Sequence, residues 1–191
     1  AKGMATGATP ATESNSGMKS RRAAAPLLLL WLASCGHVPE PSPVPEVFRA
    51  VDRLPDWELT LLRKDGGEEK VRLSALGGEV VLLWFYAPWS RPCLQEAPAL
   101  ESGFWQTYRT RRLVVVGLGL KETTESVRKF QDDQRITFRV GRDLGAALFN
   151  SFRQEGVPLH VLLDADRNIL LVSCGFDEAL LTAKIREALG E

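Results

Sequence analysis

The feature that most constrains the fold of this chain is an uninterrupted apolar run from Val80 to Phe85, which ends shortly before Pro88. A short apolar run bounded by a turn signal predicts a buried strand. A helix-like stretch begins at about Arg91, and Cys93 lies in its first turn. Backbone N–H groups and the helix dipole stabilise a thiolate at such a position. The segment therefore predicts a strand, a turn and a helix that presents a cysteine.

The chain around this segment alternates between strand-like and helix-like patterns. Alternating residues in Trp57–Leu62 and Lys70–Leu73, joined by turn residues 64–67, predict a β-hairpin. Elsewhere the pattern predicts strands over 80–86, 113–118, 136–140, 156–164 and 169–174, and helices over 91–111, 123–134, 143–152 and 176–189. Pro98 lies inside the first helix and predicts a kink. This order predicts one α/β domain over residues 51–191.

Residues 84–98 read Trp-Phe-Tyr-Ala-Pro-Trp-Ser-Arg-Pro-Cys-Leu-Gln-Glu-Ala-Pro. The segment resembles the motif of the thioredoxin-like family, in its TlpA/ResA-type membrane-tethered thiol–disulfide oxidoreductases. That motif is a strand, Trp-Cys-x-Pro-Cys, and a helix with Glu three and Pro five residues further on. The resemblance covers about residues 54–190 and implies a thioredoxin-like sandwich, a central mixed β-sheet flanked by helices, with an extra N-terminal β-hairpin.

The sequence departs from the motif at its first cysteine, which is Ser90 here. In the family that cysteine attacks a substrate disulfide and the second one, here Cys93, resolves the mixed disulfide. A serine hydroxyl does not ionise at physiological pH and forms no disulfide, so the two-cysteine cycle cannot operate through positions 90 and 93. Ser90 is either natural or a substitution made to silence or trap an enzyme. Glu96 matches the family's proton-moving glutamate, or is an exposed helix residue.

The resemblance also implies a substrate groove. Val157-Pro158 matches the cis-proline dipeptide, whose backbone pairs with an extended substrate segment in the family. Trp89 matches a flanking surface aromatic, or is ordinary packing, and Gly175 matches a glycine that lines the groove. Cys174 is either a small buried hydrophobe or a thiol close enough to Cys93 to act as a substitute partner.

Composition excludes several other classes of function. Lysine plus arginine equals aspartate plus glutamate, 24 each, whereas nucleic-acid binding usually shows a basic excess. Three cysteines and two histidines provide no cluster of metal-type spacing, so we expect no metal and no cofactor. His160 is expected to be a packed or surface histidine. We expect a monomer whose partners are protein thiols and disulfides or extended peptide segments.

The first fifty residues predict export. Residues 1–17 are a disordered leader or a mis-called start, because Met18 begins a positively charged segment. The apolar stretch Ala23–Ala33 has eleven residues, fewer than the roughly twenty that span a bilayer. It suits a signal peptide over residues 18–34. A plain secretory signal and a short buried helix are the alternatives.

Leu32-Ala33-Ser34-Cys35 resembles the lipobox of bacterial lipoproteins, which implies a lipid on Cys35. Residues 35–50 then form a proline-rich tether between the lipid and the domain. The resemblance implies a lipid-anchored protein of the bacterial cell envelope, with its domain on the periplasmic side. Thiol–disulfide chemistry is relevant in that compartment.

Three functions remain open from the sequence. The first is atypical thiol–disulfide exchange that uses Cys93, alone or with Cys174. The second is a redox-silent module that holds peptides in the groove. The third is a one-cysteine peroxidase, since Ser90 to Glu96 also resembles the peroxiredoxin Thr/Ser-x-x-Cys-x-x-Glu pattern. Tyr86 and Pro158 stand where that pattern has a proline and an arginine.

Overall fold

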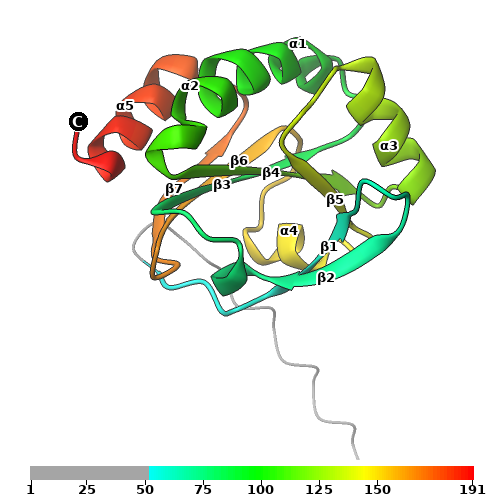
Figure 1. The fold of residues 1–191 in the computed structure, drawn as a ribbon, viewed down its shortest axis with the longest axis horizontal. Coiled ribbons are helices and arrows are strands. Elements are labelled where there is room, and N and C mark those ends of the chain that lie inside the picture. Colours follow the sequence, from blue (N-terminus) through cyan, green and yellow to red (C-terminus); the bar gives the residue numbers. More distant parts are fainter. Residues whose placement is uncertain (1–51) are drawn as a thin grey trace, which may run out of the picture. The chain divides into compact units, whose positions relative to one another are not determined.

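The computed structural model describes residues 52–191, so the predicted leader, signal peptide, Cys35 and tether lie outside the described residues. The strands are β1 Glu58–Leu62, β2 Glu68–Arg72, β3 Val80–Tyr86, β4 Leu113–Leu120, β5 Arg139–Asp143, β6 Leu159–Asp164 and β7 Ile169–Cys174. The helices are α1 Arg91–Ala99, α2 Gln106–Tyr108, α3 Thr124–Asp133, α4 Ala147–Ser151 and α5 Glu178–Leu189. The strands form a mixed sheet in the order β2-β1-β5-β4-β3-β6-β7 (Figure 1).

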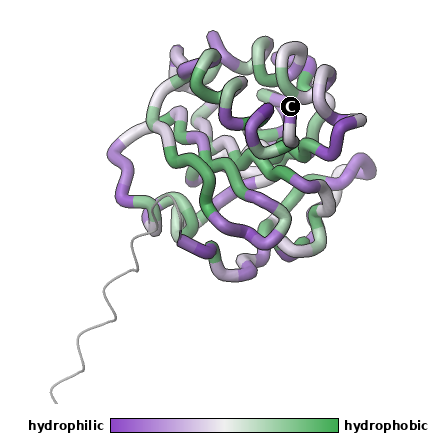
Figure 2. Tube along the Cα trace, turned by 90° about the vertical axis from the view of Figure 1, so that its left-hand side faces the viewer, coloured by the Kyte–Doolittle hydropathy of each residue, from purple (hydrophilic) through white to green (hydrophobic). Residues whose placement is uncertain are grey.

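Strand β3 lies inside the sheet and all seven of its residues are buried. It runs parallel to β4 and antiparallel to β6. Successive side chains point to opposite faces, so Leu82 and Trp84 pack with α1, α3 and α5, whereas Leu83 and Phe85 pack with α4. Figure 1 shows α1 and α5 on one face of the sheet and α4 on the other. Figure 2 shows hydrophobic residues concentrated along the strands between these layers. The predicted thioredoxin-like sandwich is confirmed.

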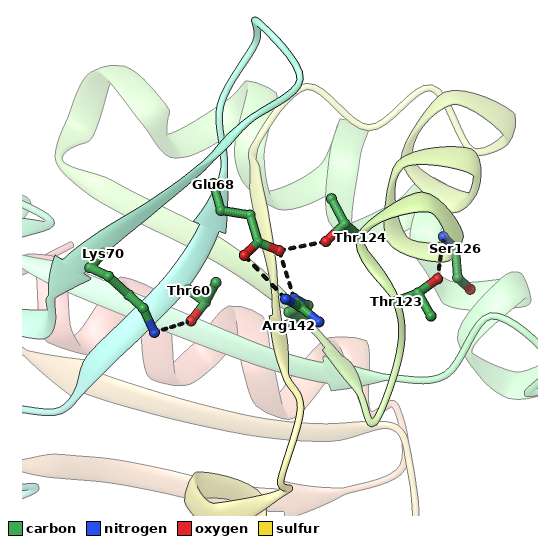
Figure 3. Close-up of polar contacts among 7 residues, drawn as sticks. All are labelled: Thr60, Glu68, Lys70, Thr123, Thr124, Ser126 and Arg142. Atoms are coloured by element: carbon green, nitrogen blue, oxygen red, sulfur yellow. Dashed lines mark hydrogen bonds and ion pairs between the residues drawn. The ribbon is translucent and has the colours of Figure 1, made fainter.

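The predicted N-terminal hairpin is present, as the antiparallel pair β1 and β2. Strand β1 joins the sheet through β5, where Leu61 pairs with Gly141. A Cβ atom on Gly141 would lie 2.1 Å from the carbonyl oxygen of Thr60, so only glycine permits this approach. Figure 3 shows a second connection, in which Glu68 accepts hydrogen bonds from Arg142 and Thr124. The hairpin is therefore held by both backbone and side chains.

Residues 91–111, predicted to form one helix, are helical throughout but do not form one regular α-helix. Helix α1 ends at Ala99, one wider π-type turn covers Leu100–Trp105, and α2 and a 3₁₀ turn complete the segment. Pro98 has no N–H to donate to the preceding turn. The hydroxyl of Ser102 donates to the carbonyl of Pro98 at 2.7 Å. The kink at Pro98 stays a prediction, and the structure shows a change of helix type that begins at Leu100.

Three predicted elements have wrong boundaries, and one of them is the strand predicted over 156–164, which begins at Leu159. The strand predicted over 136–140 begins at Arg139, because Ile136 and Phe138 are buried in the core before the chain joins β4. The helix predicted over 143–152 is shorter, since Asp143 ends β5. Its carboxylate caps α4 by accepting hydrogen bonds from the N–H groups of Ala147 and Phe149 at 3.0 and 2.9 Å.

The first described residues are hydrogen-bonded to the turn between β6 and β7. Arg53 forms an isolated antiparallel bridge with Asn168. The N–H of Leu54 donates to the carbonyl of Arg167 at 2.9 Å, and the N–H of Ile169 donates to that of Asp52 at 2.8 Å. The chain therefore enters the domain at the end of β6 that lies away from Pro158. Across residues 52–191, no helix combines the length and apolar character needed to cross a bilayer.

Candidate active site

The site is built where β3 ends and α1 begins. Ser90 is the N-cap of α1 and has extended backbone angles. Pro92 lies in the first turn of the helix, where backbone N–H groups have no partner within the helix, so the missing N–H of proline removes no hydrogen bond. The carbonyl of Ser90 accepts a hydrogen bond from the N–H of Leu94 at 3.0 Å. Ser90 is buried, at 6% exposure. The serine thus takes the structural place of a helix cap at the position where the motif has its attacking cysteine.

Cys93 lies in the first turn of α1 and is fully buried, at 0% exposure. Burial raises the pKa of its thiol, and a hydrogen bond with the side chain of Ser90 opposes that effect only in part. The carboxylate of Glu96 also raises the pKa of this thiol. Cys93 is therefore held as a protonated, covered thiol, the opposite of an exposed attacking thiolate.

Glu96 is buried at 2% exposure, so of the two interpretations of this residue the exposed helix glutamate is excluded. Its Oε1 accepts a short hydrogen bond from the indole N–H of Trp84. Nε2 of His160 lies 3.6 Å from the same oxygen, and His160 is itself 1% exposed. Glu96 Oε2 has no hydrogen-bond partner among the described residues, and neither does His160 Nε2. The site therefore contains a buried carboxylate that is only partly satisfied.

Trp84 and His160 are the site residues that sequence reasoning did not assign a role. They face each other across neighbouring strands, because Trp84 pairs with His160 in the register of β3 and β6. Their side chains reach the same buried carboxylate. A buried indole N–H needs a polar partner, which gives Trp84 a weak signal in the sequence. For His160, the feature of the sequence that indicates a place near the site is its position two residues after Pro158.

The cis peptide between Val157 and Pro158 is present, as predicted. Phe85 pairs with Leu159, so Pro158 lies at the same edge of the sheet as the end of β3 and the start of α1. Val157 packs against the hydrophobic cluster that contains Cys93. The predicted proline and cysteine are therefore brought to one end of the sheet.

Cys174 and Gly175 lie beside this proline. Cys174 pairs with Leu159 at the end of β7, and the N–H of Gly175 donates to the carbonyl of Pro158 at 2.8 Å. Cys174 is exposed, and its Sγ lies 3.6 Å from the carbonyl of Gly156. The prediction of a small buried hydrophobe at Cys174 is wrong. Both Cys93 and Cys174 are free thiols.

Trp89 is a large apolar residue with 78% of its surface exposed, directly before Ser90. Leu94 in α1 is also exposed, at 37%. Ordinary packing does not explain Trp89, since its ring is left in solvent at the edge that carries Pro158. Among residues 52–191, no three histidine, cysteine, aspartate or glutamate side chains gather closely enough to hold a metal ion.

Comparisons with known proteins agree with this geometry. The family model described as the AhpC/TSA family matches residues 50–172. The thiol-disulfide oxidoreductase ResA of Oceanobacillus iheyensis is 31% identical over 113 residues, which make up 59% of this chain and 58% of that protein. This chain therefore spans less than two thirds of the length of that relative.

Two solved structures are similar over most of the domain. One is a protein of Bacteroides thetaiotaomicron assigned as a protein disulfide isomerase, with 30% identity and a TM-score of 0.66, covering 75% of this chain and 91% of that one. The other is a Chlorobium tepidum protein assigned as the thiol:disulfide interchange protein DsbE, with 29% identity and a TM-score of 0.63. That match covers 74% of this chain and 99% of the other.

Proposed function

Because this chain belongs to the AhpC/TSA family, we propose that it is a ResA-type thiol–disulfide exchange protein that depends on Cys93. The observation that carries the proposal is a buried cysteine in the first turn of α1, at the sheet edge that also holds the cis peptide of Pro158. Because Ser90 replaces the attacking cysteine, the usual two-cysteine cycle cannot operate. Exchange is therefore slow and needs a second thiol from another molecule.

The chemistry follows from these positions. A client disulfide is attacked by Cys93 as its thiolate, so that a mixed disulfide forms and the other client sulfur leaves as a thiolate. The hydroxyl of Ser90 cannot resolve that mixed disulfide. A second protein or small-molecule thiol attacks the client sulfur or Cys93 instead. Glu96 acts as the proton acceptor for the buried thiol, because it lies one helical turn from Cys93.

The groove residues have a separate role in the proposal. The exposed ring of Trp89 contacts the client, and the backbone next to Pro158 and Gly175 pairs with an extended client segment. Cys174 stands exposed at this groove as a second thiol. Its place beside Pro158 makes it accessible to a client disulfide before Cys93 is uncovered.

We further propose that the domain works outside the cytoplasm, held by a lipid on Cys35. The support is the coincidence of a charged leader, an apolar core and a lipobox in residues 18–35. Mass spectrometry of the protein purified from a bacterial membrane fraction tests this proposal. We expect an N-terminal lipid-modified Cys35, and we expect Cys35→Ser to move the protein to the soluble fraction.

The activity is tested by reduction of insulin disulfides with an excess of dithiothreitol. The Ser90→Cys variant should increase turnover by at least about a hundredfold, since a thiolate replaces a hydroxyl at the attacking position. The double variant Ser90→Cys with Cys93→Ala is the matched control, and it should trap mixed disulfides without turnover. Brisk turnover by the wild-type chain, or no gain with Ser90→Cys, would refute the proposal.

A second function is favoured by the burial of Cys93 together with the exposure of Trp89. A chain with a covered thiol and an intact groove can hold an extended peptide without exchange. In that case an unfolded client binds the wild type and a Cys93→Ala variant equally, and Trp89→Ala weakens the binding. A peroxidase is disfavoured, because Tyr86 and Pro158 stand where the peroxiredoxin pattern has a proline and an arginine.

A further inference from the structure

The buried cluster beneath Cys93 consists of Trp84 from β3, Glu96 from α1 and His160 from β6. Each of these side chains is at most 2% exposed. The three elements are fixed relative to one another, because Trp84 and His160 are register partners and α1 packs on the same face of the sheet. The cluster is therefore a rigid feature of the core, directly attached to the helix that carries Cys93.

Two polar atoms of this cluster lack partners. Glu96 Oε2 and His160 Nε2 are buried and form no hydrogen bond with the described residues. A buried carboxylate without full pairing costs several kcal/mol of folding free energy. His160 Nε2 lies 3.6 Å from Glu96 Oε1, so a small rotation would let it donate to this carboxylate. The unpartnered nitrogen of His160 therefore lies beside the incompletely paired carboxyl group of Glu96.

Resting on the exchange function proposed above, we propose that His160 is a positioning residue that holds Glu96 in place as the base for Cys93. Nε2 of His160 is a small rotation away from donating a hydrogen bond to this carboxyl group. The indole N–H of Trp84 fixes Oε1. Together they leave one carboxylate oxygen free to accept a proton.

The proposed proton transfer balances between two side chains. The S–H bond of Cys93 breaks and its proton moves to a carboxylate oxygen of Glu96, which leaves a thiolate and a protonated carboxyl group. The summed charge of the two groups is the same before and after the step. Without His160, the carboxyl group loses the partner that orients it toward the thiol.

Other titratable groups face the cluster and need to be considered. Tyr86 lies near Cys93 on β3, and burial strongly raises the pKa of its hydroxyl, so it stays neutral. Asp177 lines a small crevice with His160, from the start of α5. Its carboxylate accepts a hydrogen bond from the N–H of Leu180 at 2.9 Å and caps that helix. Among the described residues, Glu96 is therefore the acidic residue that contacts His160, at 3.6 Å.

The first test measures how fast iodoacetamide alkylates Cys93 in the full chain between pH 5 and pH 9, with peptides resolved by mass spectrometry. Glu96→Gln should speed the reaction at pH 7, because it removes the carboxylate that raises the pKa of the Cys93 thiol. His160→Gln should also change the rate at pH 7, because the carboxyl group of Glu96 is no longer held in its position. The rates should converge at high pH, where hydroxide removes the proton. Exposed Cys174 is the internal control, and its rate should not change. Identical pH profiles for Cys93 in the three proteins would overturn the proposal.

The second test reads the wild-type protein directly and does not depend on alkylation. A proton on His160 Nε2 that is held by Glu96 should exchange slowly with water and give a separate downfield NMR signal. That signal should vanish in Glu96→Gln, while circular dichroism shows an unchanged fold. Its absence from the wild type, or its persistence in Glu96→Gln, would overturn the proposal. Failure of Ser90→Cys in the insulin assay would instead refute the exchange function and leave these two readouts intact.

Discussion

The polar groups of the hairpin and those beneath α1 are organised in opposite ways. At the hairpin, Glu68 lies near the surface and accepts hydrogen bonds from both Arg142 and Thr124 (Figure 3). Beneath α1, Glu96 is buried and keeps one oxygen without a partner. A glutamate is thus fully hydrogen-bonded at the surface, where water could also act as a donor, and incompletely hydrogen-bonded in the interior, where water is excluded.

This difference separates a structural carboxylate from a chemical one. A surface pair is worth little free energy and mainly fixes how two elements meet. A buried, partly satisfied carboxylate costs folding free energy, and such costs are concentrated at functional sites. The hairpin network should therefore respond weakly to substitution, and the cluster around Glu96 strongly.

The largest effect on stability is expected for Trp84→Phe. This change removes the donor to Glu96 Oε1 and leaves space in the core, so the free energy of unfolding should fall by about 3 kcal/mol. Denaturant unfolding followed by circular dichroism measures it. In a Glu96→Leu background, which has no carboxylate to strand, the same substitution should cost less. Equal costs in both backgrounds would show that the indole contributes packing alone.

Gly141→Ala should have the second-largest effect, because it tests how the hairpin joins the sheet. The added Cβ would meet the carbonyl oxygen of Thr60 at 2.1 Å, so β1 must move away from β5. We expect a loss of about 1–3 kcal/mol in the free energy of unfolding. The matched control is Gly145→Ala, whose Cβ would meet no atom within 4 Å. Hydrogen exchange of the β1 amides shows whether β1 has separated from β5. Protection of these amides equal to that in the wild type would contradict the prediction.

Glu68→Gln should have the smallest effect, at most about 1 kcal/mol at neutral pH. Hydrogen bonds from Arg142 and Thr124 lower the pKa of Glu68 in the folded protein. A lowered folded pKa adds stability above the unfolded pKa, and this stability is lost as the pH falls through the folded pKa. The difference between wild type and variant should therefore shrink in acid.

The control for this measurement is Glu58→Gln, since Glu58 lies 3.8 Å from Lys70 in an exposed pair. It should leave the free energy of unfolding unchanged. A Glu68→Gln cost that stays constant down to pH 2 would mean that the carboxylate charge has no part in holding the hairpin.

Much of the fold follows from local patterns in the sequence. The apolar run at β3 and the turn residues between β1 and β2 predict elements whose hydrogen bonds form within short segments. The start of β5 is different, because Ile136 and Phe138 are as apolar as strand residues but are buried before the strand begins. Asp143 similarly looks like the first residue of a helix and instead caps one from the end of a strand. These boundaries depend on tertiary contacts.

The site was predictable to the extent that it lies in one continuous motif. Ser90, Cys93 and Glu96 share one segment, and Pro158 follows from a dipeptide whose role the resemblance implies. The pairing of His160 with Glu96 depends on the register of β3 against β6, which no local pattern specifies. The exposure of Cys174 likewise depends on where β7 ends beside Gly156. Trp84 and His160, which meet across neighbouring strands, were therefore left without a role.

The hydrogen bonds between residues 52–54 and the turn after β6 fix the position of these residues relative to the groove. Strand β6 has six residues, and a strand of that length spans roughly 20 Å. The polypeptide thus arrives at one pole of the domain, while Trp89 and Pro158 occupy the other. The contacts of residues 52–54 therefore leave the edge that carries Trp89 and Pro158 uncovered, and a bulky folded client meets no obstruction from these residues there.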